Sequence, residues 1–180
     1  MIFYKKYVLF ASLLMLFACN NTNSTSKETK DTTATKVEQP VKQKVSFKDE
    51  KLNDVYTSYL ALKDALVATK FEKAKLAADV LSKSLTSANL MGSVLQSANT
   101  IAKAKDIAAQ RKEFTNLSND LIALLKKSTL SSGTIFVQHC PMANEGEGGD
   151  WLASEKKIQN PYYGSEMMEC GAVIEDIKSK

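Results

Sequence analysis

Apolar side chains recur every three or four residues between positions 52 and 125, and this spacing constrains the fold more than any other feature. It is the period of an amphipathic α-helix, which buries one stripe of its surface and exposes the rest. Three stripes are present: Leu52, Val55, Tyr56, Tyr59, Leu60, Leu62, Leu66 and Val67; Phe71, Ala74, Ala78, Leu81 and Leu85; and Ile107, Phe114, Leu117, Leu121, Leu124 and Leu125. Short links favour antiparallel neighbours. We therefore predict a mainly α fold, an antiparallel bundle of three to four helices.

The sequence indicates the ends of these helices less clearly than their apolar faces. A break falls around Thr69, between the first two stripes, and Asp106 stands directly before the third, where its carboxylate can cap the helix. The segment from Asn89 to Ser97 has little apolar periodicity and contains Gly92. We expect this segment to be a connection or a short helical turn.

After residue 133 the pattern changes to that of β-structure. The stretch TIFVQHC, residues 134–140, is β-branched and aromatic, and GAVIEDI, residues 171–177, is a second candidate strand. Between them lie the acidic loop NEGEGGDW, the turn SEKKIQ and the stretch NPYYGSEMMEC. Antiparallel pairing of the two strands would bring Cys140 close to Cys170, and Met167 and Met168 towards His139. We expect a small C-terminal β-hairpin and loop region after the bundle.

The N-terminus carries a targeting signal. Residues 1–18 have two early lysines and an apolar run that is too short to span a membrane, as in secretory signal peptides. The run ends in LFAC, which resembles the lipobox of bacterial lipoproteins, so lipidation of Cys19 is expected. Residues 19–46 then form a polar tether, and residues 47–180 a single domain with its motif region at 134–177. These features predict a membrane-anchored lipoprotein of the cell envelope, facing the periplasm of a Gram-negative cell.

Charge is unevenly distributed along the chain. The net charge is +4, but residues 19–135 carry 18 basic against 12 acidic side chains, and residues 136–180 carry 4 against 8. The basic side chains are spread over helices and tether, and no aromatic residues are interleaved with them, so nucleic acid is not an expected partner. The acidic C-terminal part would favour a cation.

Two thiols remain in the mature chain once Cys19 is lipidated. In an oxidising compartment Cys140 and Cys170 can form a disulfide. They can also bind a soft metal ion, because thiolates and thioethers select Cu(I) and imidazole suits copper too. The candidate ligands for Cu(I) or silver are His139, Cys140, Met142, Met167, Met168 and Cys170. The two interpretations are compatible, since a disulfide could still leave histidine and methionine ligands.

Several stretches resemble one bacterial domain family of uncharacterised function. They are HCPMA, DWL, IQNPYYGSEMMECG and, in the helical part, VYTSYLALKDALVA, so the likeness runs from about Val55 to Val173. The family occurs in secreted proteins and lipoproteins and is appended to periplasmic adaptors of copper and silver efflux pumps. The resemblance implies copper or silver binding by His139, Cys140, Met142, Met168 and Cys170, with efflux components as partners. Met167 is added from its local chemistry.

The remaining motif residues have structural explanations. Trp151, Tyr162 and Tyr163 are expected to cover the apolar side of the site, and the oxygen-rich loop around Glu145 and Glu147 lacks the spacing of a calcium loop. No CxxC, haem-attachment, phosphate-loop or HExxH motif is present, so an enzyme is not expected. The predicted function is capture of Cu(I) or Ag(I), for buffering or transfer to an efflux system. The alternative is a structural or interaction module of the envelope, closed by a Cys140–Cys170 disulfide and presenting the three aromatics to a partner.

Overall fold

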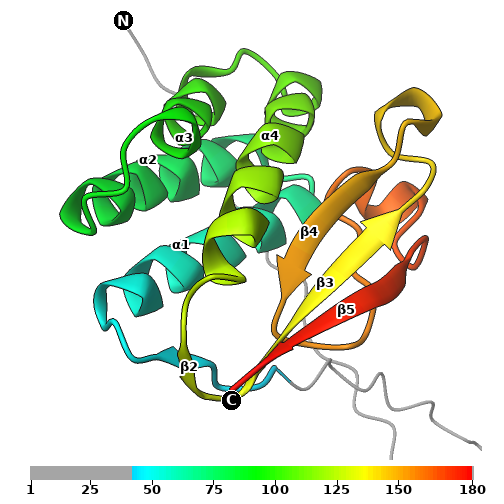
Figure 1. The fold of residues 1–180 in the computed structure, drawn as a ribbon. Coiled ribbons are helices and arrows are strands. Elements are labelled where there is room, and N and C mark those ends of the chain that lie inside the picture. The colour runs from blue at the N-terminus through cyan, green and yellow to red at the C-terminus, as the bar shows by residue number, and fades with distance from the viewer. Residues whose placement is uncertain (1–41, 180) are drawn as a thin grey trace, which may run out of the picture. The chain divides into compact units, whose positions relative to one another are not determined.

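The computed structural model describes residues 42–179, and the predicted signal peptide, Cys19 and most of the predicted tether lie outside this range. The described part of the chain contains four helices: α1 (Lys51–Val67), α2 (Phe71–Ser87), α3 (Ser93–Lys103) and α4 (Ile107–Leu125). Consecutive helices pack against one another, and α4 also packs against the sheet that follows (Figure 1). The prediction of a helical bundle followed by antiparallel strands is confirmed.

The helix α3 corrects the expectation that residues 89–97 form a connection or a single turn. Gly92 has φ of +88° and stands before the first residue of the helix, so it marks the start of α3 instead of interrupting it. The buried face of α3 consists of Val94, Ser97, Ala98, Ile101 and Ala102. Because most of these side chains are small, their apolar stripe is weak in the sequence.

The start of α4 agrees with the sequence prediction. Asp106 has an extended backbone, and its Oδ1 accepts a hydrogen bond of 2.7 Å from the backbone nitrogen of Ala109. The cap satisfies one of the backbone N–H groups that have no partner within the first helical turn.

In residues 42–179, five strands form two antiparallel sheets. The smaller sheet pairs β1 (Ser46–Phe47) with β2 (Leu130–Ser132), and the larger has the order β4 (Gly149–Ala153), β3 (Thr134–Cys140), β5 (Ala172–Lys178). Short 3₁₀ turns, η1 (Asn144–Gly146) and η2 (Gly164–Glu166), lie in the connections. The predicted pairing of residues 134–140 with 171–177 is confirmed, with His139 opposite Ala172.

The strand β4 is absent from the sequence prediction, which treats residues 144–151 as an acidic loop. Residues 145–147 are indeed exposed, but Trp151, Leu152 and Ala153 are fully buried and pair with β3. Only three apolar residues mark β4 in the sequence. The glycine and acidic residues that precede them are typical of a loop, so the strand has a weak sequence signal. The central strand of the sheet is β3.

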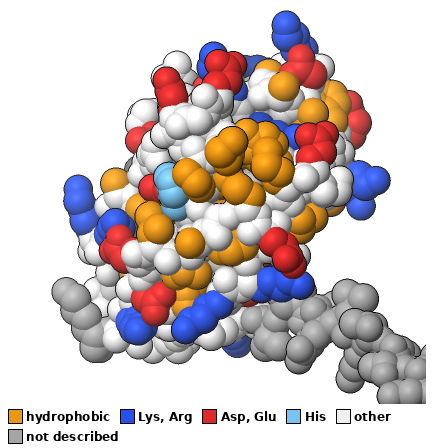
Figure 2. All heavy atoms as spheres, turned by 90° about the vertical axis from the view of Figure 1, so that its right-hand side faces the viewer, with side chains coloured by type: hydrophobic (Ala, Val, Ile, Leu, Met, Phe, Trp, Pro, Cys, Tyr) orange, Lys and Arg blue, Asp and Glu red, His pale blue; other side chains and the backbone are white. Residues whose placement is uncertain are grey.

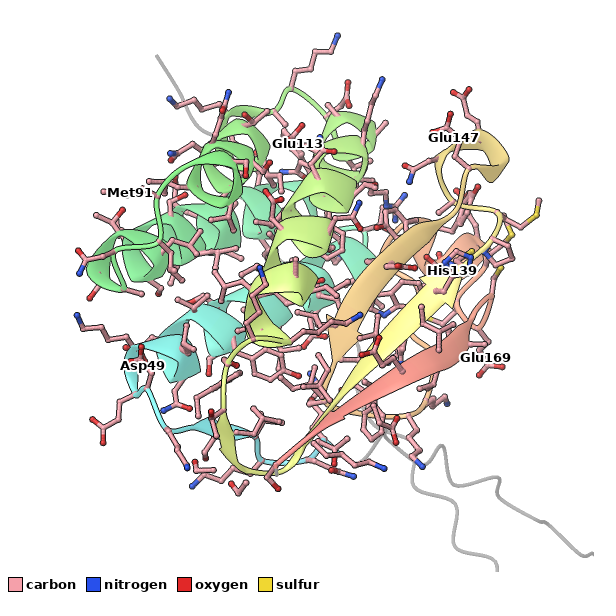
Figure 3. The ribbon with its side chains drawn as sticks, viewed as in Figure 1. Asp49, Met91, Glu113, His139, Glu147 and Glu169 are labelled. Carbon is pink, nitrogen blue, oxygen red and sulfur yellow. The ribbon has the colours of Figure 1, made fainter. Side chains whose placement is uncertain are left out.

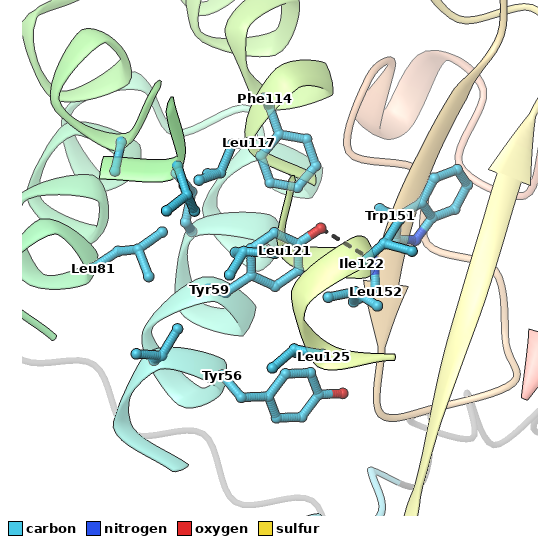
Figure 4. Packing of buried hydrophobic residues seen from close by; sticks show 14 of the residues in the cluster. Tyr56, Tyr59, Leu81, Phe114, Leu117, Leu121, Ile122, Leu125, Trp151 and Leu152 are labelled. Carbon is cyan, nitrogen blue, oxygen red and sulfur yellow. Dashed lines mark hydrogen bonds between the residues drawn. The ribbon is translucent and has the colours of Figure 1, made fainter. Parts of the chain in front are cut away.

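The core joins the helices to the sheet. Tyr59 of α1 stacks on Phe114 of α4 with ring centroids 5.4 Å apart. Its hydroxyl is 2.8 Å from Ser118 Oγ and accepts a hydrogen bond of 3.1 Å from the backbone nitrogen of Leu152 in β4 (Figure 4). A buried ion pair, Lys63 Nζ to Glu155 Oε1 at 2.6 Å, makes a second link from α1 to the segment after β4. Within residues 42–179, no helix is both long enough and apolar enough to cross a membrane.

Candidate functional site

Two cysteines meet at the end of the central strand. Cys140 is the last residue of β3 and is completely buried, whereas Cys170 lies just before β5 and is half-buried. Their Sγ atoms are 3.1 Å apart and both side chains are free thiols. A disulfide would place the sulfur atoms about 2.05 Å apart. The hydrogen bond with Cys140 raises the pKa of the Cys170 thiol. The predicted proximity of the two cysteines is thus confirmed.

Asn160 positions the segment that carries Cys170, a role that the sequence motifs do not indicate. Its side chain is buried, and its Nδ2 donates a hydrogen bond of 3.0 Å to the carbonyl of Cys170. Its Oδ1 accepts from the backbone nitrogens of Tyr162 and Tyr163, at 2.8 and 3.3 Å. Its own backbone nitrogen donates to the carbonyl of Met168 at 2.9 Å. An Asn before Pro signals a turn, but the carbonyl of Cys170 as its partner is a tertiary contact.

The turn that follows Asn160 is fixed to the helices. Arg111 of α4 donates through Nε to the carbonyl of Pro161 at 2.9 Å, and through Nη2 to the carbonyl of Leu66 at 3.2 Å. Partial burial of this guanidinium lowers its pKa. Gly164 fits against the end of α1, where a Cβ would lie 2.7 Å from the carbonyl oxygen of Val67. The stretch NPYYG therefore acts as a structural support for Cys170.

His139 has a different environment from its neighbour Cys140. Successive strand residues point to opposite faces, and His139 is half-exposed where Cys140 is buried. Its Nδ1 lies 2.6 Å from Oδ1 of Asp150, which is its cross-strand partner on β4. Within the described part of the chain, the imidazole makes no hydrogen bond to either thiol. The structure therefore brings the two cysteines together but pairs His139 with a carboxylate.

Three methionines lie two or three residues from the cysteines in the sequence, and they differ in solvent exposure. Met142 follows β3 in an exposed turn with 53% of its surface accessible, and its carbonyl accepts a 2.5 Å hydrogen bond from Tyr163 Oη. Met167 and Met168 are half-buried in the segment that leads to Cys170, where the backbone nitrogen of Cys170 donates to the carbonyl of Met167 at 3.1 Å. In residues 42–179, no three His, Cys, Asp or Glu side chains converge as a metal site. A metal site here would depend on the thioethers or on two thiols alone.

The supporting aromatics belong largely to the core. Trp151 is completely buried and Tyr162 nearly so, with ring centroids 6.0 Å apart in an edge-to-face arrangement, and Tyr162 also contacts Phe114 at 5.9 Å. Tyr163 is half-buried. Trp151 and Tyr162 are therefore too deeply buried to contact a partner protein, as the alternative function requires. Figure 2 shows instead that apolar side chains flank the histidine on the exposed face.

The fold and the site together define a small domain in which four helices support an antiparallel sheet with a dithiol at its end. Residues 55–133 match the model of a family described as a protein of unknown function (DUF3347). The matched segment covers most of α1, all of α2 to α4 and β2, and it ends before β3. This match supports the resemblance to an uncharacterised family in the helical part. Neither the curated proteins nor the solved structures include a significant match to the chain.

Proposed function

We propose that the protein is a lipid-anchored binding protein of the cell envelope that captures Cu(I) or Ag(I) through Cys140 and Cys170. The observation that carries the proposal is the 3.1 Å separation of the two free thiol sulfurs, one on the rigid central strand and the other on a half-buried segment. Thiolates are the side-chain ligands that select Cu(I) most strongly. The acidic character of residues 136–180 also favours a cation at this end of the domain.

A metal ion held by both sulfurs would require a small local movement, because the Sγ atoms are 3.1 Å apart. Two metal–sulfur bonds of about 2.3 Å put the sulfur atoms about 3.8 Å apart at a tetrahedral angle and about 4.6 Å apart in a linear arrangement. Cys140 pairs with Gly149 of β4, whereas Cys170 stands before the first residue of β5, so the opening would come from Cys170. Thioethers from Met167 or Met168, two and three residues before Cys170, are the expected additional ligands.

The same sulfur separation also favours the alternative function, an envelope module closed by a disulfide. Two thiols in contact need only an oxidant of the thiol–disulfide class to form the bond. A disulfide would close a loop of about 30 residues and stabilise the domain by roughly 3 to 4 kcal/mol in the chain-entropy account. A disulfide would remove the two thiol ligands and leave only histidine and methionine ligands for a metal ion.

The test is a Cu(I) titration of the mature chain carrying Cys19→Ser, in competition with a chromophoric chelator. We expect the reduced protein to remove one equivalent of Cu(I) from the chelator, and Cys140→Ser/Cys170→Ser to bind at least about 100-fold more weakly, because soft ligands are replaced by hydroxyls. Replacing Met167 and Met168 by leucine should weaken binding, whereas Met91→Leu should not. Met91 is an exposed methionine on the far side of the domain from His139, so it serves as the matched control (Figure 3). Failure of the reduced protein to compete with the chelator would contradict the proposal.

The membrane anchor and the efflux partner form the second part of the proposal. The prediction of a lipid anchor at Cys19 rests on the sequence of the lipobox alone. Lipidation predicts that the full chain partitions into detergent, and that Cys19→Ala abolishes both this partition and the added mass at the N-terminus. Transfer of Cu(I) or Ag(I) to a periplasmic efflux adaptor would follow from the family resemblance. Partition of the Cys19→Ala chain into detergent would count against the anchor.

A further inference from the structure

We propose that the two thiols undergo exchange with the disulfide of another molecule, that Cys170 is the thiol which meets this partner, and that the exchange releases the bound metal ion. Cys140 is then the resolving thiol, which reacts only inside the domain. The inference rests on the proposed function and adds an activity that regulates it. The partner is defined by its chemistry, a disulfide, which a small molecule or a thiol–disulfide oxidoreductase can supply.

The first step of the argument is the difference in access to the two sulfur atoms. Cys140 is completely buried and belongs to the same core cluster as Trp151 and Tyr162. Cys170 is half-buried and follows Glu169, whose side chain has 74% of its surface accessible. The rate of thiol–disulfide exchange depends on access to the reacting sulfur. A partner in solution therefore reaches Cys170 and not Cys140.

The second step is the contact between the two thiols, whose Sγ atoms are 3.1 Å apart. Gly171 permits this approach, because it has φ of +142° and a Cβ there would lie 2.6 Å from the carbonyl oxygen of His139 and 3.0 Å from Cη2 of Trp151. Any larger residue would push the start of β5 away from β3. Asn160 Nδ2 holds the carbonyl of Cys170 at 3.0 Å. Gly171 and Asn160 are thus positioning residues for the dithiol.

The exchange balances in two steps. The thiolate of Cys170, formed by loss of its proton to water, attacks one sulfur of the partner disulfide, and the other partner sulfur leaves and takes up a proton. The thiolate of Cys140 then attacks Sγ of Cys170 and displaces the second partner sulfur, which also becomes a thiol. Two electrons pass from the cysteines to the partner. In the loaded protein both sulfurs are already thiolates, and the ion leaves as Cu(I) because the disulfide offers no thiolate.

The order of reaction is tested by alkylation of the reduced mature chain carrying Cys19→Ser, with iodoacetamide as the reagent and mass spectrometry of the labelled peptides. We expect Cys170 to be labelled at least about 10-fold faster than Cys140, because access limits the rate. In urea the two thiols should react at similar rates, which controls for their intrinsic reactivity. Equal labelling in the folded chain, or faster labelling of Cys140, would overturn the assignment.

The exchange itself is tested with oxidised glutathione in the same background. Cys140→Ser should stop at the mixed disulfide on Cys170, whereas the intact pair should proceed to the internal disulfide. Gly171→Ala should accumulate the mixed disulfide, because the thiols are moved apart, and Gly146→Ala should not. Gly146 has φ of +96°, and a Cβ there would meet no atom within 4 Å. Absence of the mixed disulfide in Cys140→Ser would contradict the proposed entry through Cys170.

An oxidised CxxC protein, used in parallel with glutathione, distinguishes the two sources of the disulfide by the faster rate. Release of the ion is followed by adding the oxidant to the Cu(I)-loaded chain with a chromophoric chelator present. We expect the chelator to take up Cu(I) as the internal disulfide forms.

The outcomes separate this inference from the proposed function. If the internal disulfide forms while Cu(I) stays bound, the regulatory role is wrong and the capture of Cu(I) stands. If the reduced chain binds no Cu(I) but Cys170 reacts first and Cys140 resolves the mixed disulfide, the proposed function is wrong and the exchange activity stands.

Discussion

At the scale of single residues, His139 and Cys140 show how much a change of strand face matters. They are adjacent in the chain, yet one is half-exposed beside a carboxylate and the other is buried beside a second thiol. The sequence predicted both as candidate ligands and correctly predicted that Cys170 lies near Cys140. Asp150 could not be identified, because its role depends on a cross-strand register between β3 and an unpredicted β4.

A second residue-scale feature is the ion pair between Lys63 and Glu155. Both side chains are almost completely buried, and Ser154 Oγ donates to the second carboxylate oxygen at 2.8 Å. Removing one member of a buried pair leaves an uncompensated charge, so Glu155→Gln should lower the free energy of unfolding by about 3 kcal/mol or more. Urea denaturation measures this change.

The control for this prediction is an exposed pair. Lys126 and Glu175 are 2.5 Å apart with more than 40% of each side chain accessible. Glu175→Gln should change stability by less than about 1 kcal/mol, because water and salt screen the attraction. Equal effects of the two substitutions would show that Asp64, 3.0 Å from Lys63 Nζ, already neutralises the buried lysine.

At the scale of elements, the turn at residues 160–164 supports the site without contributing a ligand. Asn160 holds the segment before β5, and Arg111 joins the turn to α4 and to the end of α1. Asn, Pro and Gly favour a turn through their backbone preferences. The sequence could not show what the turn packs against, because Arg111 and Leu66 are distant in the chain.

Gly164→Ala tests the docking of this turn on α1. Gly164 has φ of +60°, and a Cβ would approach Thr69 Oγ1 to 2.5 Å as well as the backbone of Val67. We expect a loss of about 1 to 3 kcal/mol beyond the strain of a positive φ, because the turn must move away from the helix. Gly146→Ala reports that strain alone, since no atom would contact its Cβ. Similar losses of unfolding free energy in the two variants would argue against tight docking.

At the scale of the whole molecule, buried tyrosines connect the helices to the sheet. Burial is the main cause that raises the pKa of Tyr56, Tyr59 and Tyr162 above the ordinary value of 10.0. A group whose pKa is raised by folding stabilises the native state fully below its unfolded pKa, and this contribution is lost as pH rises further. The domain should therefore lose stability above about pH 10, at roughly 1.4 kcal/mol per pH unit for each tyrosine.

The variant Tyr56→Phe gives this pH prediction a specific control. Within residues 42–179 the Tyr56 hydroxyl is buried and has no hydrogen-bond partner, so its removal should not lower stability at pH 7. Urea unfolding between pH 8 and 11 should show a shallower alkaline loss in the variant than in the wild-type chain. An unchanged slope would mean that Tyr56 does not contribute to alkaline unfolding.

The sequence by itself determined three of the four helices, the cap of α4, the strands β3 and β5 and the approach of Cys140 to Cys170. Each depends on local periodicity, on a capping residue or on the pairing of two nearby strands. Only the tertiary structure decided that α3 is a helix, that β4 completes the sheet, and that Asn160, Arg111 and Asp150 support the site. The physical reason is that small buried side chains and polar side chains have weak local preferences. Their positions are fixed by backbone carbonyls, carboxylates and packing surfaces that lie far away in the chain.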